Sequence, residues 1–372
     1  MELLLGLVLA LRTWHAPMPA PVVAAPVAGA HALLVGDVRG DVVAFDPASG
    51  RRRWGMQLAN GVWSSPLVAG SLALVTIGSP AFITNRPSSY VLAGPGTSRI
   101  VALRLANGAY AWTYGLPGSG APAAALADGL VIHLGGSGEV LALDARTGAY
   151  RWRRFVGSAA ASSATLALVG GRVAFSGAGP NAVYVLRARD GAPLATTRLP
   201  SDALGVASEP LAVEGTTLFG AYFAREASTM RLHLYAIDAR SGALRWDRAL
   251  DAGTAARPTR LSVRDGTLYL GSPFAPRLCA YRASDGAQRW SAPLAARSLG
   301  GVIVRGGVVF AADGSGTIAA LDARTGQFRG SLHEVANFER SAPAAVGASL
   351  AIGSATGALW SIPFASIEAA RR

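Results

Sequence analysis

A motif that returns along almost the whole of this 372-residue chain constrains its fold more than any other feature. The motif reads apolar-Ala-apolar-Asp-x-x-Ser/Thr-Gly-x-x-x-Trp, and its clearest copy contains Asp144, Gly148 and Trp152. The motif residues of the other copies are Asp46, Gly50, Trp54, Gly108, Trp112, Asp238, Gly242, Trp246, Gly286, Trp290, Asp322 and Gly326. A copy around Gly191 is weaker, because Ala195 replaces the Trp, as Gly330 does after Gly326. Repeats of about 40 to 50 residues are typical of β-propeller blades.

The residue types of the motif predict a structural role. An apolar run before the Asp predicts a strand, and the Asp side chain can accept hydrogen bonds from the turn that it opens. The Gly allows the positive φ that closes a hairpin, and the Trp on the outgoing strand buries a large surface against the next blade. We therefore interpret the repeated Asp, Gly and Trp residues as framework and not as a catalytic set.

Each repeat contains two further strands before the motif, which predicts four strands per blade. The first of them carries a recurrent proline, at Pro26, Pro66, Pro122, Pro210, Pro258 and Pro343. Proline belongs on a sheet edge, and the innermost strand of a blade has such an edge. The pattern predicts an all-β, eight-bladed propeller of four-stranded antiparallel blades, with seven blades as the alternative.

The spacing also predicts how the ring closes. Trp14 precedes Pro26 by the same 12 residues that separate Trp54 from Pro66, so Trp14 occupies the position of an outer-strand Trp. The last repeat lacks a clear fourth strand. We expect residues 9–15 to supply it, so that both chain ends share one blade and leave no open edge.

The N-terminus has a second interpretation. Residues 3–11 form an apolar run that is too short to span a bilayer but has the length of a signal-peptide core. We predict a single propeller domain over residues 9–372, with residues 1–8 a signal-peptide remnant or disordered, and no transmembrane segment.

Charge and cysteine content exclude several functions. The net charge is +12, but every basic residue is Arg and these residues are scattered, which argues against nucleic-acid binding. Arg146, Arg240 and Arg324, with 51–53, fall on the short turns, where they form a rim for an anionic partner or protect strand ends from aggregation; we favour protection. The single cysteine, Cys279, allows no internal disulfide and is expected to be buried on a strand.

The motif units resemble those of the pyrroloquinoline-quinone (PQQ) repeat propellers, over nearly the whole chain from Trp14 onward. One branch of that family comprises quinoprotein dehydrogenases. The other lacks a cofactor and includes the periplasmic lipoprotein of the machinery that assembles outer-membrane β-barrels. For the enzyme branch the resemblance implies a PQQ stacked on a disulfide of adjacent cysteines, with a calcium ion and an aspartate base. With one cysteine that disulfide cannot form, and the lipoprotein's N-terminal cysteine is also missing.

Other chemistries find no support in the sequence. It contains no nucleophile elbow, no dinucleotide-binding loop and no P-loop. Its five histidines are His15, His31, His133, His233 and His333. They are widely spaced, and we interpret them as strand or loop residues.

A binding role then places function on the longest insertions between strands. These are residues 79–98, with Phe82, Arg86 and Tyr90, and residues 223–230, with Phe223 and Arg225. We predict a monomeric, non-catalytic scaffold that binds other proteins in the periplasm or cell envelope of a bacterium. We expect it to have no cofactor and no metal. The alternatives are a PQQ- and calcium-dependent oxidoreductase and a sensor that holds a small ligand in the central channel.

Overall fold

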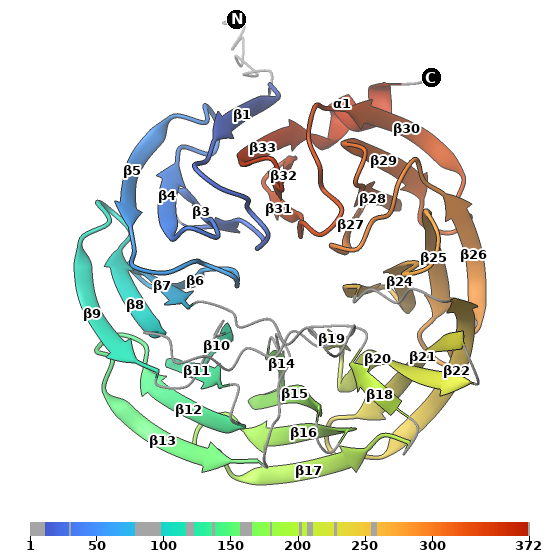
Figure 1. Ribbon diagram of the computed structural model, residues 1–372, viewed down its shortest axis with the longest axis horizontal. Coiled ribbons are helices and arrows are strands. Elements are labelled where there is room, and N and C mark those ends of the chain that lie inside the picture. Colours follow the sequence, from blue (N-terminus) through green and yellow to red (C-terminus); the bar gives the residue numbers. More distant parts are fainter. Residues whose placement is uncertain are drawn as a thin grey trace, which may run out of the picture.

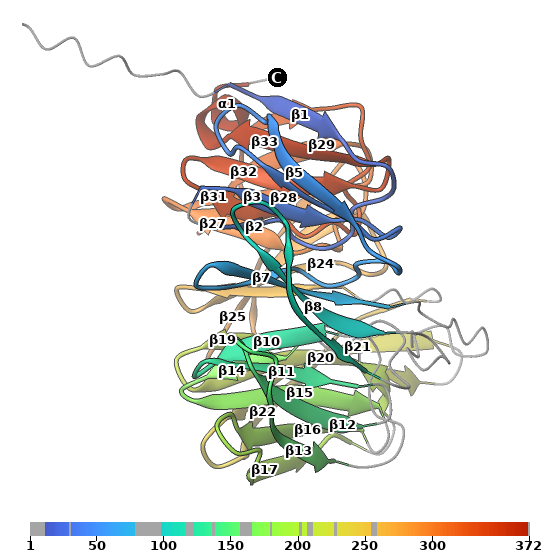
Figure 2. The same ribbon diagram turned by 90° about the vertical axis from the view of Figure 1, so that its left-hand side faces the viewer.

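The computed structural model is a ring of eight small antiparallel sheets arranged radially around a central axis (Figure 1). It describes residues 12–29, 31–78, 98–116, 123–135, 138–156, 166–178, 181–200, 203–206, 211–226, 229–253 and 259–370. In most blades the first strand along the chain lies nearest the axis and the last lies on the outside of the ring. Figure 2 shows the blades from the side of the ring. The prediction of an eight-bladed propeller is confirmed, and the seven-bladed alternative is wrong.

The first four blades follow one another along the chain. Blade 1 contains β2 (Val27–Ala28), β3 (Leu33–Gly36), β4 (Asp41–Phe45) and β5 (Arg52–Gln57). Blade 2 contains β6 (Leu67–Ala69), β7 (Leu72–Ile77), β8 (Arg99–Arg104) and β9 (Tyr110–Gly115). Blade 3 contains β10 (Ala123–Ala127), β11 (Leu130–Leu134), β12 (Glu139–Asp144) and β13 (Tyr150–Phe155). Blade 4 contains β14 (Ala167–Val169), β15 (Arg172–Ala178), β16 (Asn181–Arg187) and β17 (Pro193–Arg198).

The second half of the ring includes one larger blade and the blade that closes it. Blade 5 contains β18 (Ala203–Val206), β19 (Ala212–Glu214), β20 (Thr217–Glu226), β21 (Thr229–Asp238) and β22 (Leu244–Gly253). Blade 6 contains β23 (Leu261–Arg264), β24 (Thr267–Gly271), β25 (Arg277–Arg282) and β26 (Gln288–Pro293). Blade 7 contains β27 (Val302–Arg305), β28 (Val308–Ala312), β29 (Thr317–Asp322) and β30 (Phe328–His333). Blade 8 contains β31 (Ala344–Val346), β32 (Ser349–Ser354), β33 (Ala358–Pro363) and β1 (Trp14–Pro17). The helix α1 (Phe364–Ala369) follows β33.

Blade 8 confirms that the N-terminal part of the chain closes the ring, although the closing strand spans Trp14–Pro17 and not the predicted residues 9–15. Its outer strand β1 comes from the N-terminal end of the described chain and pairs antiparallel with β33, in a register that sets Trp14 opposite Ser361. Figure 1 shows β1 beside the C-terminal elements. Because β1 pairs with β33, the strand edge of blade 8 is covered where the two ends of the ring meet.

The hydrophobic core is divided among the interfaces between neighbouring blades. Every described position of the second strand is buried in most blades, namely in β3, β7, β11, β24, β28 and β32. The outer strands behave differently, because in β13 only Trp152 is buried. Continuous apolar strands therefore fill the space between blades, while the outer strand faces solvent except at its Trp. Cys279 is buried on β25, as expected.

The inner strands explain the recurrent proline. Pro26, Pro66 and Pro343 each stand directly before the innermost strand of a blade. Proline has no N–H to offer, so it ends the ladder there without leaving a donor unpaired.

Blade 5 departs from the sequence-based expectation. Strands β20 and β21 form one long hairpin whose register pairs Phe223 with Leu232, so the predicted insertion from residue 223 is mostly strand and not loop. Two short strands, β18 and β19, pair with different halves of β20. The apolar run that includes Phe219 and Ala221 continues the strand, because its side chains alternate between two buried faces.

Candidate functional site

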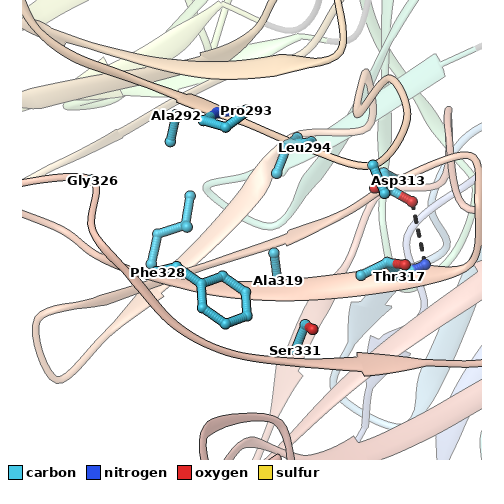
Figure 3. Close-up of a pocket in the computed structure, with 11 residues that line it drawn as sticks. Ala292, Pro293, Leu294, Asp313, Thr317, Ala319, Gly326, Phe328 and Ser331 are labelled. Carbon is cyan, nitrogen blue, oxygen red and sulfur yellow. Dashed lines mark hydrogen bonds between the residues drawn. The ribbon is translucent and has the colours of Figure 1, made fainter. Parts of the chain in front are cut away.

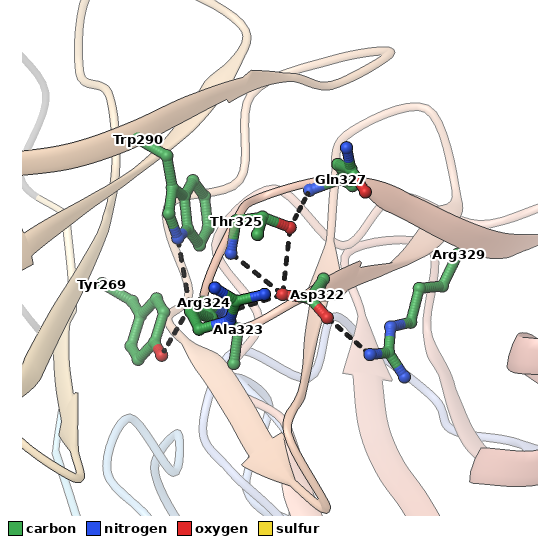
Figure 4. A network of polar contacts seen from close by, with 8 residues as sticks. All are labelled: Tyr269, Trp290, Asp322, Ala323, Arg324, Thr325, Gln327 and Arg329. Carbon is green, nitrogen blue, oxygen red and sulfur yellow. Dashed lines mark hydrogen bonds and ion pairs between the residues drawn. The ribbon is translucent and has the colours of Figure 1, made fainter.

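The motif Asp organises the hairpin turn between the third and fourth strands of blades 1, 3, 5 and 7. In blade 3, Asp144 Oδ1 accepts hydrogen bonds from the backbone N–H groups of Arg146 and Thr147 and from the Thr147 hydroxyl. Its Oδ2 accepts a bond from Arg151, seven residues further on. Figure 4 shows the same network around Asp322 in blade 7. These carboxylates thus have their oxygens occupied by the turn itself.

These contacts shift the titration of the carboxylates. The Arg53 guanidinium, the Ser49 hydroxyl and nearby backbone N–H groups lower the pKa of Asp46 to about 2. The corresponding arginine lowers the pKa of Asp144, Asp238 and Asp322 in the same way. A carboxylate with so low a pKa has little affinity for a proton, so it is a poor general base near neutral pH.

The motif Trp joins each blade to the next. The Trp152 indole of blade 3 lies against Gly191 of blade 4, where an added Cβ would stand 2.5 Å from the ring, and its Nε1 donates a bond of 3.0 Å to Ala188 O. Gly191 has φ +68°, so glycine is required both by the backbone and by the indole. The residues whose Nε1 makes the equivalent bond are Trp14, Trp54, Trp112, Trp246 and Trp290.

At two blade interfaces another residue stands in place of this Trp, and different contacts fill the space of the indole. At the interface of blades 4 and 5, Ala195 faces Gly242 and the Thr197 hydroxyl donates a 2.6 Å bond to Gly242 O. In blade 7 the Trp position is Gly330, and α1 covers it: an added Cβ would lie 2.6 Å from Ile367 O. The helix thus fills the room that an indole occupies elsewhere. The motif residues therefore serve blade packing.

The candidate binding site is a pocket of about 430 Å³ between blades 6 and 7, which we call the outer pocket (Figure 3). One wall is the end of β26 with Ala292 and Pro293, followed by Leu294. The opposite wall is formed by β29 and β30 and includes Phe328, which is 46% exposed. An exposed aromatic ring beside an apolar pocket is a surface suited to a partner's apolar side chain.

The polar end of the outer pocket is already satisfied. Asp313 Oδ1 accepts bonds from the Ser315 and Thr317 backbone N–H groups and from the Ser315 hydroxyl, and its Oδ2 accepts one from Ala296 N–H. Asp313 is buried and orders the turn between β28 and β29. Its contacts give it a structural role in the pocket.

Sequence reasoning missed a polar cluster in blade 5. The Tyr222 hydroxyl lies 2.6 Å from Asp247 Oδ2 and 3.0 Å from His233 Nδ1, and Nδ1 lies 2.9 Å from Asp247 Oδ1. His233 Nε2 is buried, and no described residue forms a hydrogen bond with it. The three residues come from three adjacent strands, and only strand register brings them together. Register between Tyr222 and His233 was the one signal that could have revealed them.

The predicted partner-binding residues have different fates. Phe82, Arg86 and Tyr90 lie outside the described residues. Phe223 is fully buried on β20 between blades 5 and 6, so its assignment to a surface loop is wrong. The strand β20 continues through Phe223 because apolar neighbours cover both faces of the strand. Arg225 is exposed near the end of the same strand.

The described residues contain neither a cluster of metal-binding side chains nor a membrane-spanning helix. In these parts of the chain, His, Cys, Asp and Glu side chains nowhere gather in a group of three or more that could hold a metal ion. The helical structure in the same ranges is nowhere long and apolar enough to cross a bilayer.

Eight radial blades, hairpin turns organised by the motif Asp, and blade interfaces filled by the motif Trp define the chain as a PQQ-repeat β-propeller. It belongs to the family described as "Outer membrane protein assembly factor BamB", whose profile matches residues 11–168, 79–230 and 230–366. A comparison with curated protein sequences found no match.

Solved structures similar to this chain share its fold at low sequence identity. BamB from Moraxella catarrhalis has 17% identity and a TM-score of 0.68, covering 94% of this chain and 98% of its own. The computationally designed Ika8 protein has 14% identity and a TM-score of 0.69, covering 94% and 98%. Saccharomyces cerevisiae Sqt1 has 12% identity and a TM-score of 0.70, covering 94% and 97%.

Proposed function

We propose that this propeller is a non-catalytic scaffold that binds other proteins, acts without a cofactor, and serves the assembly of outer-membrane proteins in the bacterial cell envelope. The observation that carries the proposal is the use of the repeated Asp, Gly and Trp residues in blade packing. Asp144, for example, is fully engaged by its own turn, and Trp152 by the next blade. What remains for function is surface, namely exposed strand edges and the outer pocket.

Family membership supports the envelope role, because the matching profile carries the description of an outer-membrane assembly factor. The outer pocket supplies a place for a partner. Its Phe328 is exposed at the outer edge of blade 7, and an aromatic anchor beside an apolar pocket is typical of the residues that dominate binding energy. We propose that a partner inserts an apolar side chain between β26 and β30.

The test uses the purified chain and the purified soluble domains of the outer-membrane assembly proteins of the same host. Binding is measured by isothermal titration calorimetry, for the native chain and for Phe328→Glu. We expect one of these domains to bind, and the substitution to weaken it at least about tenfold, because a desolvated carboxylate costs more than about 1.4 kcal/mol in the pocket.

The control is Tyr150→Glu. Tyr150 stands two residues after Gly148, as Phe328 does after Gly326, and is 55% exposed. It does not line the outer pocket. We expect this variant to bind like the native chain. Equal loss in both variants would reject the outer pocket, and no binding to any assembly protein would reject the assembly role.

The quinoprotein alternative is tested separately by titrating the chain with PQQ and calcium while tryptophan fluorescence is recorded. Saturable, calcium-dependent quenching would contradict a cofactor-free scaffold.

A further inference from the structure

A second pocket, of about 340 Å³, opens between blades 6 and 7 on the face that carries the short hairpin turns. Four arginines line it: Arg264, Arg289, Arg305 and Arg324. Asp265 is the one acidic residue among the described residues that line it, while Glu214 lies nearby with its carboxylate bonded to Gly266 N–H. We call this site the arginine pocket. It shares no lining residue with the outer pocket.

Most of the positive charge in the arginine pocket is uncompensated. Asp265 lies 3.6 Å from the Nε of Arg264, and both side chains are largely exposed. The guanidinium of Arg289 donates to Gly266 O, and that of Arg305 donates to Gly347 O and lies over an aromatic ring. Within the described chain, no carboxylate forms an ion pair with Arg289 or Arg305, nor with Arg324.

A departure from the repeat explains why Arg289 is available. In blades 1, 3, 5 and 7, an arginine seven residues after the motif Asp pairs with it, as Arg245 pairs with Asp238. Arg289 occupies the same position in blade 6, but Arg282 stands where the Asp would be. Arg282 instead lies 3.5 Å from Asp285. The substitution thus removes the partner of Arg289 and adds a further positive charge nearby.

Hydroxyl groups lie deeper in the arginine pocket. Thr267 and Tyr269 both line it and are buried. The Tyr269 hydroxyl donates a 3.4 Å bond to Ala323 O, the carbonyl that also accepts from Trp290 (Figure 4). Arg324 follows Ala323 directly and lines the same pocket as Thr267 and Tyr269.

We propose that the arginine pocket binds a phosphoryl group, either as free phosphate or carried on a lipid headgroup. Guanidinium groups bind phosphate oxygens through paired, planar N–H bonds. Arg289 and Arg324 have no carboxylate partner among the described residues. Arg305 adds a further positive charge, although its guanidinium is held against blade 8 by Gly347 O and the Phe364 ring. This excess of positive charge favours a doubly charged oxyanion over a single carboxylate. This site is independent of the proposed protein scaffold, since it lies outside the outer pocket.

The test is a calorimetric titration of the full chain with inorganic phosphate at low ionic strength. We expect saturable binding of one phosphate per chain and at least a tenfold loss of affinity in Arg289→Ala. The control is Arg245→Ala, which removes an equal charge from the same repeat position in blade 5, where the arginine is paired. We expect less than a twofold change there.

A second pair of variants tests the role of the repeat. Arg282→Asp restores the motif Asp, which should capture Arg289 and abolish phosphate binding. Arg187→Asp makes the same charge change at the motif position of blade 4, where Leu194 stands seven residues later and nothing is captured. We expect Arg187→Asp to bind like the native chain. An equal loss in both variants would show a diffuse charge effect and overturn the proposal.

Vesicle sedimentation distinguishes the two sources of the phosphoryl group. Binding to phosphatidylglycerol vesicles that Arg289→Ala abolishes would identify a lipid headgroup. Phosphate binding without vesicle binding would identify a soluble ligand. The proposal is rejected if phosphate gives no saturable heat up to about 10 mM, an affinity near the weak limit of specific binding, whether or not vesicles sediment the protein.

Discussion

A buried histidine gives this protein a calculable sensitivity to mild acid. His133 lies on β11 and is 2% exposed, and its Nδ1 is 3.0 Å from Ala123 O. Because a carbonyl oxygen only accepts, Nδ1 carries the proton of the neutral ring. Burial lowers the pKa of His133 from 6.5 to about 4, against a smaller opposing effect of that hydrogen bond.

The direction of the effect follows from the lowered pKa. Below pH 6.5 the unfolded chain binds a proton at this residue that the folded chain does not accept until about pH 4. The free energy of unfolding therefore has its full value above pH 6.5 and falls as the pH drops toward 4. For one such group the loss between pH 7.5 and pH 5 is about 2 kcal/mol.

The assay is urea unfolding followed by tryptophan fluorescence at pH 7.5, 6.5, 5.5 and 5.0. It compares the native chain with His133→Gln, which keeps a side-chain donor for Ala123 O but does not titrate. We expect the free energy of unfolding to fall by about 2 kcal/mol more in the native chain than in the variant over this range. All other residues are the same in both proteins, so any contribution from them cancels. Parallel pH profiles would refute the assignment of a buried, neutral His133.

The remaining predictions concern the blade framework. Trp152→Ala removes a buried indole and its bond to the next blade, and should lower the free energy of unfolding by about 3–5 kcal/mol in urea titrations. Gly330→Trp forces a Cβ to within 2.6 Å of Ile367 O, and should cost at least about 1 kcal/mol by the same assay because α1 must move. Asp46→Asn should make the free energy of unfolding depend less on pH in the acid range. The pKa of Asp46 is lowered to about 2, so its contribution is complete above about pH 4 and is lost as the pH falls toward 2.

Each of these predictions has a matched control. Trp152→Phe keeps an aromatic ring and should cost less than Trp152→Ala. Gly115→Ala adds a Cβ with nothing within 4 Å, so it should change stability by less than about 0.5 kcal/mol. An acid profile of Asp46→Asn that matches the native chain would show that this turn does not contribute. If Gly330→Trp proves neutral, the packing of α1 against β30 does not exclude an indole.

The strongest sequence prediction concerned the chain of blades. Spacing alone placed Trp14 in an outer strand, and the structure pairs that strand with β33 and sets the indole against Gly50. This worked because most blades repeat the same local contacts, so that the recurring Asp, Gly and Trp indicate the turn, the hairpin closure and the packing of the next blade. Phe223 shows the limit. Its assignment to a loop failed, because the length of a hairpin depends on the neighbouring blades that bury it.

The sequence by itself determined the blade type and the closure of the ring and favoured eight blades over seven, because these follow from local patterns that recur along the chain. The tertiary structure alone decided which side chains meet between blades. It brought Tyr222, His233 and Asp247 into one cluster, although no spacing in the sequence marks them. It also brought Arg289 of blade 6 and Arg305 of blade 7 into the lining of one pocket. Contacts of this kind depend on strand register and on how adjacent sheets pack, and a pattern within one repeat carries no record of either.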